Sequence, residues 1–421
     1  MSRSYGFRRI VLIVVASILL LNAGTSLAAP VTKYDPLVID TFRSPATNDL
    51  GIWHGADEGM PAEYGEGFLR LRPTNADMNF YTQLSISCNN MTGYKDAYLH
   101  VVFKGTDKFS ISFTQHNAAC DQKRAPYPET WDSVEASRYA NGEDIYVPLS
   151  HFNIDFTRAN SIGFHGFYTR EEVTLFKVEI ISAPPGAVNT PQKLPTGTLV
   201  LKCKRPNSFA FGIDDGQPQY AQEVMKILAE EDILVTFFTV GNGLLDESAN
   251  FTNVYKEMLG RGHQVALHTF SHPILALLKN LRLTSVKDGR ITNYRGHRPG
   301  IREEHGNANM VLNLGRYFRP PFGNVGARTR QRLAALVTDP YIVNWSVDIE
   351  DWLWAGSPTP EKQFEAFKRD FEKGGDIAVM HYLNPTTISY FRDVFQLVKK
   401  SGKRIMRVDQ CMEDPSAPPL H

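Results

Sequence analysis

The sequence has no excess of charge, few cysteines, and no long apolar run outside its N-terminus. Lys and Arg together number 45, as do Asp and Glu, so the net charge of the 421 residues is 0. A chain without a net charge has no overall field that favours nucleic acid or an anionic membrane. We therefore expect no nucleic-acid partner, and the length allows two domains, each with its own core.

The single long apolar run has the features of a signal peptide. Three arginines precede Ile10–Leu21, and the small-x-small triplet Ser26-Leu27-Ala28 follows. This order predicts a secretory signal over residues 1–28 and a secreted protein without stable membrane insertion after cleavage. An uncleaved anchor is the alternative, although the run is short for a membrane span.

Only four cysteines are present, and export would allow them to form disulfides. Of the three possible pairings we favour Cys88–Cys120 and Cys203–Cys411, the second of which would join the two ends of the C-terminal half. Glycosylation sequons, which predict a glycoprotein, occur at Asn90, Asn250 and Asn344. Glycosylation of Asn344 is not expected, because it lies within an apolar strand.

Residues 30–183 have little helical periodicity. Their short runs alternate apolar and polar residues, as in Phe109–Phe113, and are bounded by Gly, Pro and Asn. Many short strands predict an all-β, jelly-roll-like sandwich domain. The strand-like runs are Gly67–Leu71, Ala97–Phe103, Phe109–Phe113, Asp144–Val147, Ser161–Phe167 and Val173–Ile181.

This first half has no cluster of His, Asp and Glu with catalytic spacing. It is rich in aromatic residues, which can stack on sugar rings, although each one alone is more often part of a core. We interpret the domain as a possible carbohydrate-binding module with weak affinity. The candidate platform residues are Trp53, Tyr64, Tyr81, Tyr127, Trp131, Tyr139 and Tyr168.

A segment rich in Pro, Gly and Thr, residues 184–198, is typical of a linker. Beyond it, over residues 199–415, strand-like runs alternate with amphipathic helices such as Thr386–Lys400. This alternation predicts an α/β fold, a parallel barrel with its site at the C-terminal ends of the strands.

The most informative stretch is Ser208–Ile213, a buried strand followed directly by Asp214 and Asp215. Adjacent carboxylates repel each other, so a nearby metal ion or arginine would stabilise them. A solvated turn at Asp215-Gly216 is the ordinary alternative.

A second motif places His268 and His272 four residues apart. On a helical turn two such imidazoles would lie on one face and could share a metal ion. Together with Asp215 they would supply two histidines and one carboxylate, a set that suits zinc and leaves coordination positions open.

Three further motifs are weak singly and are interpreted with the others. They are Arg319-Pro-Pro-Phe322-Gly323, Asp348-Ile-Glu-Asp351-Trp352 and Val379-Met-His381. The order DDG, HTxxH, RPPFG, DxxDW and a strand ending in His resembles the polysaccharide deacetylases, carbohydrate esterase family 4. The resemblance covers about the C-terminal half of the chain.

The resemblance implies a distorted (β/α) barrel and metal-dependent removal of acetyl groups from glycans, commonly chitin. The protein would act as a monomer on an acetylated polysaccharide, in the extracellular space or the cell wall. The cofactor would be Zn²⁺, with Co²⁺ or another divalent metal as a substitute. By motif, Asp214 would be the general base and His381 the general acid. The metal ligands would be Asp215, His268 and His272.

The same resemblance gives roles to the remaining motif residues. Arg319 would pair with Asp214, and Asp348 would orient or tune His381. The backbone N–H near Phe322 would stabilise the oxyanion. Trp352 would line the acetyl pocket, and Asp351 is assigned to substrate binding.

The chain departs from the family pattern at three places. Gly212 stands where the family has Thr or Ser, and Phe322 where Tyr is common. The segment Ile274–Gly315 is basic and irregular where the family has a regular helix, so it is a divergent loop or an error in the gene model. We interpret His297 and His305 within it as exposed and without ligand partners.

The leading hypothesis is N-deacetylation of chitin or chitooligosaccharides. O-deacetylation of xylan or another wall polysaccharide uses the same chemistry and is not separated from it by the sequence. A non-catalytic carbohydrate-binding protein on a degenerate deacetylase scaffold is the third hypothesis, which the retained acidic and histidine motifs disfavour.

Overall fold

The structure, a computed structural model, describes residues 35–75, 78–241, 251–269, 272, 282–287, 290–295, 315–323 and 325–420. The predicted signal peptide, Asn250, His297 and His305 lie outside the described residues, as does most of Ile274–Gly315. In the part that is described, no helix combines the length and the apolar character that crossing a membrane requires.

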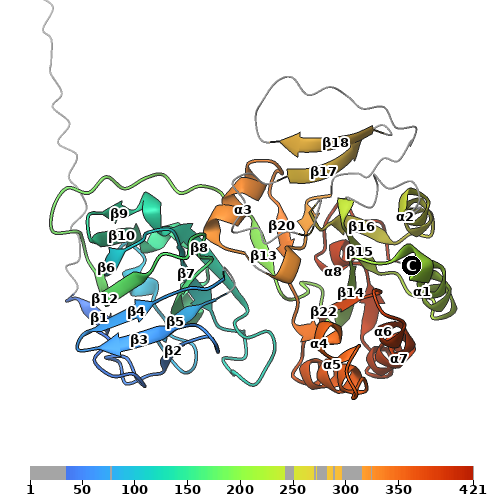
Figure 1. The fold of residues 1–421 in the computed structure, drawn as a ribbon, viewed down its shortest axis with the longest axis horizontal. Helices are drawn as coiled ribbons and strands as arrows, with labels where there is room; N and C mark the ends of the chain where they lie inside the picture. Colours follow the sequence, from blue (N-terminus) through green and yellow to red (C-terminus); the bar gives the residue numbers. More distant parts are fainter. Residues whose placement is uncertain are drawn as a thin grey trace, which may run out of the picture. The chain divides into compact units, whose positions relative to one another are not determined.

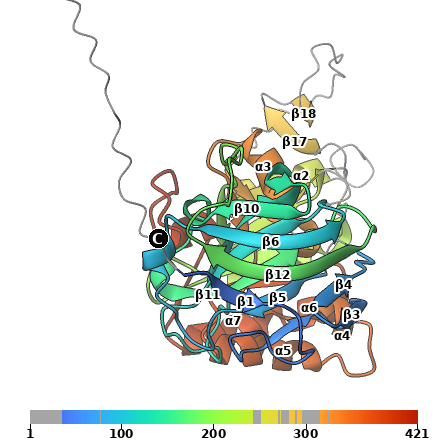
Figure 2. The same ribbon diagram turned by 90° about the vertical axis from the view of Figure 1, so that its left-hand side faces the viewer.

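The N-terminal region is a sandwich of two antiparallel sheets, as predicted (Figure 1). The larger sheet has the order β3-β4-β12-β6-β10-β9, with β1 beside β12, and Figure 2 shows β10, β6 and β12 side by side. Its strands are β1 Leu37–Asp40, β3 Ala62–Gly65, β4 Phe68–Leu71, β6 Tyr98–Gly105, β9 Ala140–Asn141, β10 Asp144–Pro148 and β12 Val173–Ile181.

The second sheet has the order β2-β5-β11-β7-β8. Its strands are β2 His54–Ala56, β5 Phe80–Gln83, β7 Ser110–Gln115, β8 Thr130–Glu135 and β11 Ala159–His165. Alternate apolar residues of both sheets meet in a core with many phenylalanines, including Phe80, Phe109, Phe113 and Phe164. Several strands escaped prediction because they are short and mixed in polarity, as in β3.

The C-terminal region contains a nine-stranded parallel sheet of the order β13-β20-β19-β16-β15-β14-β22-β21, with β23 also paired to β14. The strands are β13 Thr198–Val200, β14 Ser208–Asp214, β15 Thr236–Thr239, β16 Gln264–Leu267, β19 Tyr317–Phe318, β20 Tyr341–Val343, β21 Val347–Asp348, β22 Ile377–His381 and β23 Arg404–Met406. This confirms the predicted distorted (β/α) barrel. The described part also contains an antiparallel pair, β17 Arg282–Lys287 and β18 Arg290–Arg295.

Helices accompany this sheet. They are α1 Pro218–Glu230, α2 Phe251–Gly260, α3 Ala327–Ala334, α4 Asp351–Trp354, α5 Lys362–Glu372, α6 Pro385–Ser389, α7 Phe391–Lys400 and α8 Val408–Cys411. Of these helices, α1, α2, α5, α6 and α7 share a buried apolar cluster with the strands of the sheet. The helix predicted over Thr386–Lys400 is in fact two helices, because Tyr390 separates α6 from α7. The apolar face of α7 is buried, as the amphipathic pattern of this segment predicted.

The segment predicted as a linker has specific contacts in the structure. Thr196 Oγ1 donates a hydrogen bond to Asp132 Oδ1 of β8 at 2.9 Å, and Lys193 also pairs with Asp132. Arg330 of α3, which is 2% exposed, lies 3.4 Å from the same carboxylate and donates to the carbonyls of Thr196 and Trp131. Residues Tyr34–His421 accordingly form one compact unit.

Most of the aromatic residues proposed for a sugar platform have other contacts. Tyr139 is 3% exposed in the core, and Tyr64 packs against it. Trp131 packs on a cluster that includes Leu333 of α3. Tyr127 hydrogen-bonds to Asn160, and Tyr168 lies under Arg328 and hydrogen-bonds to Glu135. Burial removes Tyr139 from the predicted platform, the contacts of the other four occupy part of their surface, and Trp53 and Tyr81 stay the main candidates.

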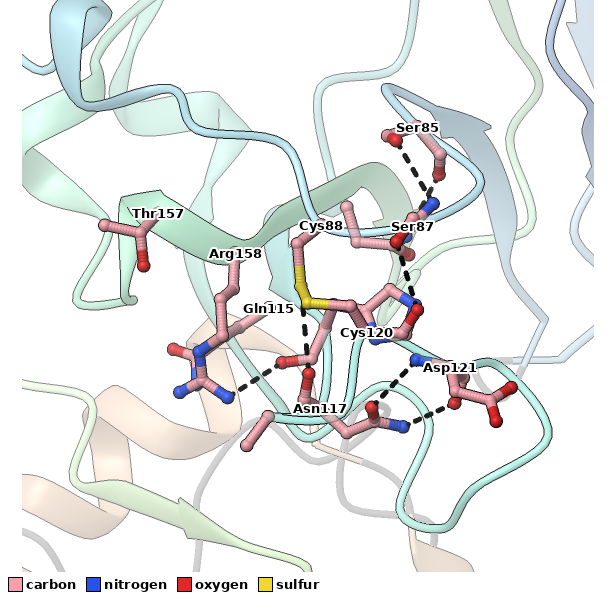
Figure 3. The surroundings of a disulfide bond; sticks show 12 residues. Ser85, Ser87, Cys88, Gln115, Asn117, Cys120, Asp121, Thr157 and Arg158 are labelled. Carbon is pink, nitrogen blue, oxygen red and sulfur yellow. Dashed lines mark hydrogen bonds between the residues drawn. A yellow bond between two sulfur atoms is a disulfide. The ribbon is translucent and has the colours of Figure 1, made fainter.

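Both predicted disulfides are present, Cys88–Cys120 and Cys203–Cys411. Figure 3 shows the first beside Asn117, whose backbone carbonyl lies 3.8 Å from Cys88 Sγ. The Asn117 side chain donates to the backbone carbonyls of Asp121 and Arg124, so these hydrogen bonds hold the loop together with the disulfide.

Candidate active site

The two adjacent aspartates at the end of β14 point to different partners. Asp214 is 2% exposed and is the last residue of the strand, whereas Asp215 has a left-handed backbone with φ 56°. Asp214 Oδ1 accepts a hydrogen bond from Arg319 Nη1 at 2.7 Å. Asp215 Oδ1 lies 3.6 Å from His268 Nε2 and 3.8 Å from His272 Nε2. The two carboxylates thus have different nearest partners, and Asp214 Oδ2 also lies 3.8 Å from His268 Nε2.

Arg319, directly after β19, has no exposed surface and fixes the position of Asp214. Its guanidinium also donates to the carbonyls of Val343 and Ala378, at 3.1 and 3.3 Å. The group lies 4.2 Å from the centre of the Phe238 ring. A buried arginine with this many acceptors cannot turn away from Asp214 without leaving donors unpaired.

The two histidines of the second motif lie together, but their backbone is not that of a helical turn. His268 follows β16, and both Thr269 and His272 have left-handed backbones, with φ 66° and 49°. The rings lie 4.9 Å apart, and the His272 backbone N–H donates to Thr269 Oγ1. The prediction of a helical turn was wrong at Thr269 and His272, whose left-handed backbones do not belong to a helix.

The residues present fit a divalent metal ion. Asp215, His268 and His272 each offer one ligand atom, and these atoms all lie within 4.8 Å of one another. His268 Nδ1 donates to the Arg319 carbonyl at 2.8 Å, which leaves Nε2 with a free lone pair facing the aspartates. Burial lowers the pKa of His268, although Asp214 and Asp215 oppose this, so the neutral, metal-binding imidazole is favoured.

Asp215 supplies a second indication that this triad suits a cation. Its Oδ1 atom is buried and has no hydrogen-bond partner among the residues that the structure describes. A buried carboxylate oxygen is normally paired or bound to a metal ion. An ion between Asp215 and the two imidazoles would satisfy it.

His381, the last residue of β22, is held by Asp351. Asp351 Oδ1 accepts a hydrogen bond from His381 Nδ1 at 2.8 Å, and Oδ2 accepts one from the His381 backbone N–H at 2.7 Å. Burial disfavours the charged ring, but the carboxylate of Asp351 outweighs it and raises the pKa of His381 to about 9. The Asp351 carboxylate therefore favours the imidazolium form of His381.

This geometry corrects one assignment made from the sequence. Asp351, rather than Asp348, makes the hydrogen bonds that orient His381, one through each of its carboxylate oxygens, and Asp351 also lines the cavity. That Asp348 tunes His381 and that Asp351 binds substrate stay predictions. The Asp348 carboxylate instead accepts from the Glu350 backbone N–H at 2.7 Å. Burial raises the pKa of Asp348 to about 6.

These groups line one cavity of about 450 Å³. Its rim carries large apolar side chains that remain accessible: Phe322 is 58% exposed, Trp352 72% and Leu383 42%. The Phe322 ring lies 4.6 Å from the His272 ring. The lining also includes Trp345, Asn384 and Thr387, which the sequence analysis did not identify although the latter two closely follow His381.

The sequence of this region matches a known family. Residues 202–339 match the family model described as polysaccharide deacetylase. The chain contains a polysaccharide deacetylase domain. This match covers the motifs from Asp214 to Phe322, and the Asp348 and His381 motifs lie beyond it.

Curated relatives of the deacetylase domain are distant in sequence. A chitin deacetylase of Pestalotiopsis sp is 27% identical over 228 residues, which span 53% of this chain and 70% of that protein. A chitin deacetylase of Colletotrichum lindemuthianum is 25% identical over 253 residues, or 57% of this chain and 95% of that protein. The solved chitin deacetylase structure from the same fungus covers 54% of this chain and 99% of its own, with a TM-score of 0.41 and 22% identity.

The glycine that departs from the family pattern gives space to the buried arginine of the deacetylase domain. A Cβ atom on Gly212 would lie 2.3 Å from Arg319 Nη1 and 2.5 Å from Nη2. Gly212 therefore lets the guanidinium lie against strand β14 while it holds Asp214. In this chain the smaller residue and the position of Arg319 are coupled.

The described sequons differ in accessibility. Asn90 is exposed, and its Oδ1 atom accepts hydrogen bonds from the backbone and hydroxyl of Thr92. Asn344 is 8% exposed, and its Nδ2 atom donates to the Gly323 carbonyl at 2.9 Å. The position of Asn344 agrees with the expectation that it does not carry a glycan.

Proposed function

We propose that the protein is a secreted, metal-dependent polysaccharide deacetylase that hydrolyses N-acetyl groups of chitin or chitooligosaccharides. The observation that carries the proposal is one cavity with an arginine-held aspartate, an aspartate-held histidine and a metal-binding triad. The chitin deacetylases among its relatives support the choice of substrate.

In this proposal Asp214 acts as the general base. A divalent ion on Asp215, His268 and His272, most suitably Zn²⁺, would polarise the acetyl carbonyl and increase the acidity of water. Asp214 is within hydrogen-bonding reach of Arg319 through one oxygen only, so its other oxygen can accept the proton of the attacking water molecule. The role of Arg319 is to keep this carboxylate fixed and charged.

In this proposal His381 completes the reaction as the general acid. Because its Nδ1 atom donates to Asp351, its Nε2 atom is the one free to give a proton. As the C–N bond breaks, this proton passes to the leaving nitrogen, which yields acetate and the free amine of the glycan. A backbone N–H near Phe322 remains our candidate for stabilising the oxyanion, and Trp352 for contact with the substrate at the cavity rim.

The decisive experiment is acetate release by the full chain with Zn²⁺ or Co²⁺ supplied. The substrates would be a chitooligosaccharide, acetylated xylan and an aryl acetate, with Asp214→Asn as the control. Release from the chitooligosaccharide supports the proposal. Release from xylan alone would favour the O-acetyl esterase, and release from none would favour a non-catalytic carbohydrate-binding protein.

A second candidate function, glycan binding by the sandwich, rests on Trp53 and Tyr81. Strand register places Gly55, Tyr81 and Gly163 in one row across β2, β5 and β11. A Cβ atom on Gly55 would lie 2.5 Å from the Trp53 ring, and one on Gly163 would lie 2.8 Å from the Tyr81 ring. Both rings thus lie over glycines on one sheet face, and Trp53 is 49% exposed.

Retention of the full chain on insoluble chitin would test this binding separately from catalysis. We expect Trp53→Ala to reduce retention while acetate release from a soluble oligosaccharide stays unchanged. Equal retention of Trp53→Ala and wild type would remove the Trp53 site and leave the deacetylase proposal intact.

Secretion is supported by the two disulfides, which persist in oxidising compartments. We expect the exported protein to carry a glycan on Asn90, whereas Asn344 stays unmodified. A mobility shift on glycosidase treatment that is lost in Asn90→Gln and kept in Asn344→Gln would support this. Recovery of the protein only from the cell interior would contradict secretion.

A further inference from the structure

The turn that carries Asp351 has a strained backbone at one residue. Glu350 has φ 53° and ψ 34°. This left-handed backbone conformation is rare for residues other than glycine and asparagine. Helix α4 begins at the next residue, Asp351, so the backbone at Glu350 sets the direction in which Asp351 points. Such a conformation persists only where surrounding contacts hold it.

Three contacts hold Glu350. Its backbone N–H donates to Asp348 Oδ1 at 2.7 Å. Its Oε2 atom accepts from Trp354 Nε1 at 2.9 Å, and its Oε1 atom accepts from Arg369 Nη2 at 2.8 Å. Arg369 belongs to α5, which packs beside α4 (Figure 1). The strained residue is thus tied to its own turn and to a neighbouring helix.

Helix α5 also holds the other end of this turn. The Asp370 carboxylate accepts from Arg369 Nε and Nη2 at 2.8 and 2.9 Å, and from the Asp348 backbone N–H at 3.3 Å. Arg369 therefore shares its guanidinium between Glu350 and Asp370. Neither Glu350 nor Arg369 is among the described residues that line the cavity, so each can act on the site only through others.

We propose that Glu350 and Arg369 are positioning residues that aim His381 into the cavity through Asp351. Asp351 binds His381 at both the backbone N–H and Nδ1, so a rotation of Asp351 would carry the imidazole with it. The ion pair is partly exposed, with Arg369 47% and Glu350 22% accessible, and is modest by itself. It matters because it opposes a backbone strain of similar size.

The proposal rests on the proposed acid role of His381, and its test compares two substrates. Arg369→Ala and Glu350→Ala should lower kcat for a chitooligosaccharide roughly 10-fold, because a small misplacement of a reacting group is costly. KM should change little, and hydrolysis of an aryl acetate, whose leaving group needs no proton, should change less. The basic limb of the pH profile should move to lower pH in both variants.

Two further variants separate positioning from general destabilisation. Lys368→Ala removes an exposed ion pair with Glu372 on the same helix and should leave kcat and the pH profile unchanged. Glu350→Gly loses the carboxylate but adopts a left-handed backbone without strain. It should therefore retain more amide activity than Glu350→Ala.

The positioning role is overturned if Arg369→Ala behaves like Lys368→Ala, or if both substrates lose rate equally together with a fall in Tm. A wild type without amide activity, or a His381→Ala variant that retains it, would instead overturn the proposed function. The two failures are thus distinguishable.

Discussion

The side of the cavity that holds Asp214 depends on Arg319, a side chain with no exposed surface, whereas the side that holds His381 depends on Arg369, which is 47% exposed. We call these the base side and the acid side. Arg319 donates to a carboxylate and several carbonyls within the sheet, so any change there leaves buried groups unpaired. Arg369 acts from outside through a turn. Substitutions on the base side should therefore lower activity sharply, whereas substitutions on the acid side should lower it by smaller steps.

The largest effect is expected on the base side, for Asp214→Asn. This variant should lower turnover roughly 10²–10⁴-fold, because it removes proton transfer. It should still bind about one metal ion, since Asp215 and the two imidazoles remain. Acetate release and metal analysis would measure both properties. The matched variant replaces Asp215, His268 and His272 with alanine, and it should bind no metal ion. If it bound as much metal as wild type, the ligand assignment would be refuted.

His381→Ala tests the acid side. Loss of the acid should slow N-acetyl substrates roughly 10²-fold, because an amine leaves poorly without a proton, and should slow an aryl acetate far less. Rates on a chitooligosaccharide and on an aryl acetate, measured side by side, would show the difference. Equal losses on the two would mean that His381 has a structural or oxyanion-stabilising role instead.

Gly212→Ser tests whether the packing around Arg319 on the base side leaves space for a larger residue. The added atoms would overlap the Arg319 guanidinium, so we expect the free energy of unfolding to fall by about 1–3 kcal/mol and activity to fall with it. Urea denaturation would measure the change in the free energy of unfolding. Gly356→Ser is the control, since a Cβ atom there meets nothing within 4 Å. Equal stability of the two variants would show that Arg319 can move aside.

The smallest effect is a shift in pH dependence. The pKa of His381 is raised to about 9, against the effect of burial, by Asp351. The acid form is active, so Asp351→Asn should lower this pKa and move the basic limb of the rate profile to lower pH. Asp348→Asn should move it less, because Asp348 makes no direct hydrogen bond to His381 among the contacts described. A larger shift from Asp348→Asn would restore the assignment first made from the sequence.

Sequence reasoning located the site because its residues follow strand ends. Asp214, Arg319 and His381 each come directly after a short apolar run or end one, and parallel strands bring such ends together. The disulfides were predictable from the order of the cysteines along the two halves. These features depend on local pattern and on the fold class alone.

What the sequence did not predict depends on single backbone angles and on packing between distant segments. The motif alone does not tell Asp348 from Asp351, and the left-handed Glu350 lies between them where the chain turns Asp351 toward His381. The left-handed Thr269 likewise replaced the expected helical turn. Trp131, a candidate for the sugar platform, packs instead against a cluster that includes Leu333 of α3. No local pattern encodes these choices.

The disulfide Cys203–Cys411 joins residues 208 positions apart, near the two ends of the deacetylase domain. A protease that cuts the chain once between them would produce two pieces that remain one covalent molecule. On a gel, such nicked protein would migrate as an intact chain without reductant and separate into fragments with it. Because both pieces stay attached, strands from either side of the cut would remain at high effective concentration, and single cleavage would be a poor way to inactivate this enzyme.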